Sequence, residues 1–274
     1  MVNSVQKTAE RILPEAACRS RDAYLLYLRH LFAYDAAKAW LSPESLVMEV
    51  GCGEGYGTRH LSQHVRHITG LDVEPTIIEH ASKKYGSERC AFSIYDGVTL
   101  PYEDQTFDVV VAFETIEHIK DDARFLTELY RVIKEGGQCL LTTPNGRSRL
   151  RPGQKPWNRF HVREYAPAEL HDLLSSVFSH VELWGIIGTK EIQAIEQARV
   201  AQAQRFAALD LLNLRRWLPP AWETWLVTLV KNILHPRQAS EAGEDFLTRY
   251  HLEDYCLTRQ TIEESFDLLA ICRK

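Results

Sequence analysis

The amino-acid sequence predicts an α/β fold: a doubly wound, mostly parallel sheet of seven strands, with N-terminal helices and a helical insertion before the last strand. Three observations predict it. Five short apolar runs follow one another between residues 46 and 144, helix-like segments separate them, and several runs end in a glycine or an acid. Such alternation is typical of a parallel sheet that is covered by helices on both faces.

The expected elements follow in order along the chain. Residues 20–41 place apolar side chains at helical spacing and predict one or two helices, within an N-terminal helical cap over residues 1–44. The helix-like segments of the core are 56–64, 75–85 and 121–133. The expected strands are LVMEV, HITGLDV, CAFSIYD, FDVVVAF and QCLLTTP, with SHVELWGII (179–187) and DLLAICRK (267–274) at the far end of the sheet.

Residues 189–245 break this alternation. Their composition is strongly helical, and prolines bound the second half on both sides. We interpret the segment as an insertion that divides the core into residues 45–188 and 246–274. It is expected to form either a lid over the substrate or a helical hairpin packed on the core. Peripheral association with a membrane through residues 217–234 is a weaker hypothesis, because the basic charge there is modest.

A glycine-rich loop follows the first predicted strand and opens a helix. A dinucleotide-binding fingerprint would have another glycine where Tyr56 stands, which weighs against a bound pyrophosphate. Asp72 ends the second strand, at a place suited to accept both hydroxyls of a ribose. Asp96 ends the third and could accept from the exocyclic amine of adenine. The glycines that let the backbone bend and approach a ligand closely are Gly51, Gly53 and Gly55.

Four blocks of the sequence together resemble the class I S-adenosylmethionine-dependent methyltransferases. They are VMEVGCGEGYG, GLDVEPTIIEHA, YDGVTLPYEDQTFDVVVAFETIEHI and LTELYRVIKEGGQCLLTTPN, and the similarity covers about residues 45–187 with the closing strand near 268. The resemblance implies S-adenosylmethionine as the cofactor. It also implies the strand order 3-2-1-4-5-7-6, with the last strand antiparallel.

The same resemblance implies roles for individual residues. Glu49 and the glycine loop would face the methionine part of the cofactor, Asp72 would hold the ribose and Asp96 the adenine N6. Val73 and Gly97 would flank the adenine. The backbone after Phe113 would contact the amino-acid end of the cofactor.

The segment ETIEH follows the fourth strand. If a helical turn begins near residue 114, then Glu114, Glu117 and His118 share one face. Acids in the first turn of a helix are favoured by its dipole, so a purely structural role is one interpretation. In a second, His118 is a general base for a substrate hydroxyl. In a third, the three residues bind a hard divalent cation such as Mg²⁺ or Mn²⁺.

A second segment, KPWNRFHVREYAPAEL at 155–170, is expected to return over the same edge of the sheet and bring His161 with it. The pairing of ETIEH with this segment is similar to small-RNA 2′-O-methyltransferases, in which two Glu and two His hold a metal. ETIEH also resembles the O-methyltransferases of ubiquinone biosynthesis. The resemblance implies His118, Glu117 and His161 as catalytic residues. The implied metal ligands are Glu114, Glu117, His118 and His161.

Charge and composition narrow the range of partners. The net charge is −5, so we expect no extended nucleic-acid surface. The six cysteines are scattered without zinc-site spacing, and no leader or membrane-spanning run is apparent, so we expect a cytoplasmic protein. Between residues 146 and 164 lies a loop with six Lys or Arg and no acid. It is either a solvated face or a site that attracts an anionic substrate.

The expected function is methyl transfer from S-adenosylmethionine to a hydroxyl of a small molecule or a sugar or glycan. One alternative is a non-catalytic scaffold that binds the same cofactor and recruits a partner. Another is a 2′-O-methyltransferase that acts on an RNA end. An oxidoreductase on the same sheet is disfavoured by Tyr56 and by the lack of a Tyr-x-x-x-Lys pair where hydride transfer would need one.

Overall fold

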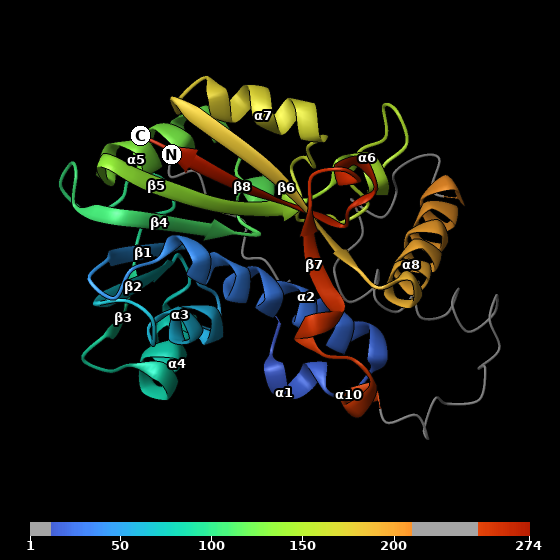
Figure 1. Ribbon diagram of the computed structural model, residues 1–274, viewed down its shortest axis with the longest axis horizontal. Helices are drawn as coiled ribbons and strands as arrows, with labels where there is room; N and C mark the ends of the chain where they lie inside the picture. Colours follow the sequence, from blue (N-terminus) through green and yellow to red (C-terminus); the bar gives the residue numbers. More distant parts are fainter. Residues whose placement is uncertain (1–11, 210–245) are drawn as a thin grey trace.

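A computed structural model describes residues 12–209 and 246–274, and its centre is a sheet of eight strands with helices on both faces (Figure 1). The strand order is β3-β2-β1-β4-β5-β8-β6-β7. The strands are β1 (Leu46–Val50), β2 (His67–Asp72), β3 (Cys90–Ile94), β4 (Phe107–Phe113), β5 (Ile133–Pro144), β6 (His180–Gly188), β7 (Tyr255–Thr258) and β8 (Asp267–Arg273).

The first seven positions of this sheet have the predicted order. Strands β1 to β5 are parallel to one another, and β8 lies between β5 and β6 and is antiparallel to both. The predicted count of seven strands is wrong by one edge strand. β7 pairs antiparallel with residues 185–188 of β6. It has only four residues, YCLT, which is too short for a periodic pattern to be read from the sequence.

The helices connect these strands and cover both faces. On one face α5 and α7 pack on the sheet, and on the other lie α2, α3 and α4 (Figure 1). The α-helices are α1 (Pro14–Ala17), α2 (Arg21–Ala37), α3 (Tyr56–Leu61), α4 (Pro75–Tyr85), α5 (Asp122–Val132), α6 (Gly146–Arg149), α7 (Pro167–Ser175), α8 (Lys190–Leu209) and α10 (Phe246–Arg249). The 3₁₀ helices are η1 (Lys38–Trp40), η2 (Ile116–His118), η4 (Leu252–Asp254) and η5 (Ile262–Glu264).

Two apolar cores lie on opposite faces of the sheet, and β4 contributes to both. Val110 and Ala112 belong to the core formed with α5 and α7. Val109 and Val111 belong to the core formed with α2 and α3. Because successive side chains of a strand point to opposite faces, a strand buried on both faces must be apolar throughout. This explains the unbroken VVVAF run.

The predicted N-terminal helices are present as α1 and α2, and α2 packs Leu25 and Leu28 into the second core. The predicted insertion begins with α8 directly after β6, and Ile192 packs into the same core. The rest of the insertion up to residue 245, with the segment 217–234, lies outside the described residues. The expected domain boundaries and lid therefore stay predictions. No helix within residues 12–209 and 246–274 is both long and apolar enough to cross a bilayer.

Asn145, directly after β5, ties the sheet to the segment that precedes β8. Its side chain is fully buried, and its Nδ2 donates to the carbonyl oxygens of Ile262 (2.8 Å) and Ser265 (3.0 Å). Its Oδ1 accepts from the backbone N–H of Arg147 at 3.0 Å. The chain before β8 is therefore held beside the loop that leaves β5.

We expect Asn145→Ala to lower the free energy of unfolding by about 2–3 kcal/mol, because buried carbonyl and amide groups lose their partners. Asn145→Asp should be at least as destabilising, since a carboxylate would face the same two carbonyl oxygens. Urea unfolding followed by circular dichroism measures both. An Asn145→Asp variant as stable as the original protein would contradict this assignment of donor and acceptor.

Candidate active site

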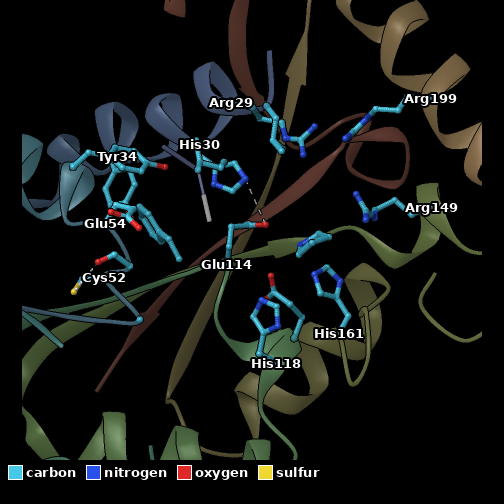
Figure 2. A pocket seen from close by; sticks show the side chains of 18 of the residues that line it. Arg29, His30, Tyr34, Cys52, Glu54, Glu114, His118, Arg149, His161 and Arg199 are labelled. Carbon is cyan, nitrogen blue, oxygen red and sulfur yellow. Dashed lines mark hydrogen bonds and ion pairs between the residues drawn. The ribbon is translucent and has the colours of Figure 1, made fainter. Parts of the chain in front are cut away.

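A cavity opens at the carboxyl edge of the parallel strands (Figure 2). Five parts of the chain that are distant in sequence line it. They are α2, the glycine loop after β1, the end of β4, the loop after β5, and α8, represented by His30, Gly53, Glu114, His161 and Arg199. Ligands of open α/β sheets bind at this edge, so the cavity lies where the sequence predicted a site.

The glycine loop meets the cavity at a point with free space. Gly51, Gly53 and Gly55 have φ angles of 78°, 49° and 82°, a region that L side chains rarely adopt. A Cβ on Gly51 would lie 2.4 Å from Oγ1 of Thr115, so the backbone passes too close for any side chain. A Cβ on Gly53 would meet no atom within 4 Å. Gly53 thus presents bare backbone to the cavity, as a closely approaching ligand requires.

Asp72 and Asp96 lie at the same edge with carboxylate oxygens that can still accept hydrogen bonds. Oδ2 of Asp72 accepts from the backbone N–H of Gly53 at 3.1 Å, which fixes the glycine loop to the end of β2. The backbone N–H groups of Thr99 and Val98 both donate to Oδ1 of Asp96 and lower the pKa of its carboxyl. A carboxylate has about four lone-pair positions, so each has capacity for a ribose hydroxyl or an adenine amine.

The remaining residues assigned to the cofactor by resemblance differ in their placement. Val73 packs against the first core, Gly97 has a φ of 80°, and Phe113 lines the cavity. Glu49 does not line it: its side chain is fully buried and accepts from Tyr34 Oη and Thr58 Oγ1, both at 2.5 Å. Burial raises the pKa of Glu49 despite these two hydrogen bonds. Glu49 joins α2 and α3 beneath the site.

Glu114 lies apart from the expected helical face. The expectation that a helical turn begins near residue 114 is wrong: Glu114 has a left-handed backbone, with φ of 46°, and η2 starts only at Ile116. The carboxylate of Glu114 faces α2, where its Oε2 lies 4.0 Å from Nε2 of His30. Burial raises the pKa of Glu114 well above its usual value, and the charges of Asp267 and Glu117 raise it further.

Glu117, His118 and His161 come together as predicted. One ligand atom from each lies within 4.8 Å of the others, and the two imidazole rings meet edge to face with centroids 4.9 Å apart. Oε2 of the buried Glu117 accepts from Thr143 Oγ1 at 3.0 Å. Three of the four predicted metal ligands therefore share one place. Glu114 instead groups with His30 and Asp267.

The partners of the two histidines define which ring nitrogen carries the proton. Nδ1 of His118 lies 3.1 Å from the carbonyl oxygen of Phe160, and Nδ1 of His161 lies 2.7 Å from Oε1 of Glu164. A carbonyl oxygen can only accept, so Nδ1 of His118 must donate; a carboxylate favours the same for His161. When such a ring is neutral, Nε2 is the nitrogen that carries the lone pair.

Several residues of this site were not predicted from the sequence. Glu164, buried beneath the site, also binds Nε of Arg149 at 2.9 Å. Burial would raise the pKa of Glu164, but hydrogen bonds from His161 and Arg149 and their charges lower it. His30 and Tyr34 of α2 line the cavity as well. No motif marks His30 and Tyr34, because the sequence of α2 shows only apolar spacing, and Glu164 lies in the loop before α7.

A sheet of this order, a glycine loop after β1 and carboxylates after β2 and β3 together define the class I S-adenosylmethionine-dependent methyltransferases. The open space at Gly53 and the acceptor oxygens of Asp72 and Asp96 fit that cofactor. Residues 48–141 match the family model described as methyltransferase domain.

Known proteins agree with this assignment. A probable S-adenosylmethionine-dependent methyltransferase of Mycolicibacterium smegmatis is 37% identical over 163 residues, which are 58% of this chain and 62% of that protein. One of Mycobacterium tuberculosis is 34% identical over 168 residues, 61% of this chain and 58% of its own length. The match thus spans less than two thirds of these curated relatives.

A solved structure of similar fold is an S-adenosylmethionine-dependent methyltransferase of Thermotoga maritima, titled a possible histamine N-methyltransferase. It has a TM-score of 0.55 at 19% identity and covers 92% of this chain and 95% of its own. More distant relatives are named as a phosphoethanolamine N-methyltransferase and a sterol 4-C-methyltransferase. The family therefore includes acceptors other than oxygen.

We expect Gly53→Ala to separate ligand binding from stability. The added methyl group would enter the space that a ligand needs, so the affinity for S-adenosylhomocysteine should fall about tenfold or more in calorimetry. Gly136→Ala is the matched control: Gly136 also has a positive φ, 74°, and free space around its Cβ, but lies in β5 outside the cavity lining. Each variant should lose about 1 kcal/mol of stability. Equal affinity in the two variants would contradict this placement of the ligand.

Proposed function

We propose that this protein transfers the methyl group of S-adenosylmethionine to a hydroxyl oxygen of a small molecule or a sugar or glycan. The observation that carries the proposal is the pair of histidines beside the glycine loop. An acceptor oxygen faces Nδ1 of both His118 and His161, so Nε2 is the basic nitrogen of each ring when that ring is neutral. Both residues line the cavity. Proton removal from a hydroxyl requires such a basic nitrogen. Neither an amine acceptor nor a carbon acceptor explains it as directly.

When bound, S-adenosylmethionine supplies a methyl group on a positively charged sulfur. The glycine loop and Asp72 would hold the donor, and the cavity walls would hold the acceptor beside it; this positioning would supply much of the rate. Nε2 of His118 takes the hydroxyl proton. The neighbouring carboxylate of Glu117 stabilises the resulting imidazolium.

A divalent cation is a second way to activate the hydroxyl. Glu117, His118 and His161 could hold Mg²⁺ or Mn²⁺, which would lower the pKa of a bound hydroxyl. In this version Glu114, the fourth ligand implied by resemblance, would have to turn from His30 toward the ion. Carboxylate and imidazole ligands together suit such an ion. Glu117 is buried and hydrogen-bonded to Thr143, which supports either a ligand or an orienting group.

Two other functions are distinguished by ligand binding. A non-catalytic scaffold would bind the cofactor without turnover, and an RNA-end 2′-O-methyltransferase would use the same residues on a larger acceptor. The net charge of −5 does not favour RNA, whose binding proteins carry broad positive surfaces. A small molecule is therefore favoured over an RNA end as the methyl acceptor.

Calorimetry with S-adenosylhomocysteine and with NAD tests the cofactor. We expect S-adenosylhomocysteine to bind and NAD to fail, because Asp72 and Asp96 suit an adenosine while Tyr56 stands where a pyrophosphate site has glycine. Binding of NAD alone would overturn the proposal. A scaffold would be favoured by two results together. S-adenosylhomocysteine would bind tightly, and no methyl transfer from S-adenosylmethionine would be detected to any alcohol, phenol or sugar in a library.

His118→Ala and Glu117→Gln should each lower turnover about 10²–10⁴-fold while the affinity for S-adenosylhomocysteine stays nearly constant. His171→Ala is the control, since His171 is exposed on α7 and outside the cavity lining. Dialysis against EDTA then separates the two mechanisms. Full activity after chelation means that His118 acts as a base, and activity that returns only with Mg²⁺ or Mn²⁺ means a metal. Unchanged turnover in His118→Ala would contradict both the general-base and the metal mechanism.

A further inference from the structure

Three arginines line the part of the cavity that lies away from the glycine loop. Arg29 comes from α2, Arg149 from α6 and Arg199 from α8. Figure 2 shows all three on one side of Glu114, whereas Cys52 of the glycine loop lies on the other. Because the glycine loop is assigned to the methyl donor, the arginines border the space left for the acceptor.

Each guanidinium separates a buried carboxylate from the cavity. Nε of Arg149 lies 2.9 Å from Oε2 of Glu164. Nη1 of Arg29 and Nη2 of Arg199 lie 3.1 and 2.6 Å from Oε2 of Glu196. Glu164 and Glu196 are buried, and neither lines this cavity, whereas all three arginines do. On this side the arginines line the cavity, whereas the carboxylates that they pair with do not.

These ion pairs do not use all the N–H donors of Arg149 and Arg199. A guanidinium has five N–H groups. Glu164 accepts from Nε and Nη2 of Arg149, and Glu196 accepts from Nε and Nη2 of Arg199. Among the described residues no acceptor is assigned to Nη1 of either arginine. The protein's own carboxylates thus balance the charge of the cluster without using all of its donors.

One further donor in the cavity wall is buried without a hydrogen-bond partner. Nε1 of Trp157 has none in the described part of the chain, and the Arg149 guanidinium lies over its ring at 4.5 Å from the centroid. Arg29 is only 2% exposed, and its Nε forms an ion pair with Oδ2 of Asp267 at 2.6 Å. Buried polar groups without partners are rare, so the indole N–H points to a ligand that accepts.

We propose that Arg29, Arg149, Arg199 and the indole N–H of Trp157 form a subsite for an anionic group, a carboxylate or a phosphate, of the methyl acceptor. The inference rests on the proposed methyl transfer and narrows its substrate to an acidic hydroxyl compound. An anion only accepts hydrogen bonds, which matches a wall made of donors. Guanidinium groups bind carboxylate and phosphate oxygens in pairs, so they also orient the acceptor.

The exposed basic loop is a poorer anion site than this wall. Arg147 pairs with Glu263 at the surface, and Arg163 donates to Asp122 at 2.5 Å. Both side chains are about half exposed or more, at 63% and 49%, where salt and water screen their charges. Only Arg149 of that loop turns into the cavity. Arg147 therefore serves as a control: it carries the same charge but does not line the cavity.

The test is calorimetric titration of the protein, saturated with S-adenosylhomocysteine, with inorganic phosphate and separately with acetate. We expect binding of at least one anion, weakened about tenfold in Arg149→Gln and in Arg199→Gln, as for loss of a charge-assisted hydrogen bond. Arg147→Gln should bind as the original protein does. The side chain of Arg199 is 25% exposed, so its variant should fold even if Arg149→Gln does not.

The outcomes are distinct. Binding of phosphate alone assigns a phosphorylated acceptor, binding of acetate alone assigns a carboxylic acid, and binding of both supports the shared chemistry. Binding that is equal in Arg199→Gln and Arg147→Gln, or no binding of either anion, overturns the subsite. If S-adenosylhomocysteine itself fails to bind, the proposed methyl transfer is lost, and titration of the free protein with the same anions still judges the subsite.

Discussion

The burial of β4 between two apolar cores decides where this protein can present polar side chains. Val109 and Val111 face one helical layer and Val110 and Ala112 face the other, so the stretch from Val109 to Phe113 carries no polar side chain. The chain must carry its reactive groups past the end of the strand. Glu117 and His118 lie there, and the glycine loop after β1 reaches the same edge because β1 and β4 are parallel.

Much of the fold follows from patterns that are local in the sequence. The strands, the glycine loop and Asp72 were predictable because each depends on a short run of residues and on its neighbours along the chain. β7 was not, since four residues of an edge strand gain their place by pairing with β6. His161 was expected to reach the site because the loop after the fifth strand should return over the same edge, and the structure places its ring 4.9 Å from that of His118.

Two acidic residues have contacts that the sequence did not indicate. Glu114 was assigned to a helical face from spacing alone, and this was wrong: its left-handed backbone turns it toward His30. Glu49 was expected to face the methionine part of the cofactor, which stays a prediction, and Tyr34 and Thr58 bind its carboxylate. Both depend on α2, which packs against the sheet from a distant part of the chain. Spacing reports the geometry within one element and carries no information on which other element will meet it.

β8 is the last strand in sequence but occupies an interior position, between β5 and β6. Until residues 267–273 have been synthesised, β5 and β6 each present an unpaired edge, and the ion pair between Arg29 and Asp267 cannot form. Unpaired edges of apolar strands invite pairing with other chains. A nascent chain of this protein therefore passes through a long interval with an open gap in its sheet. The strand that closes the gap also brings Asp267 beside Arg29, so the sheet and this side of the cavity are completed in one step.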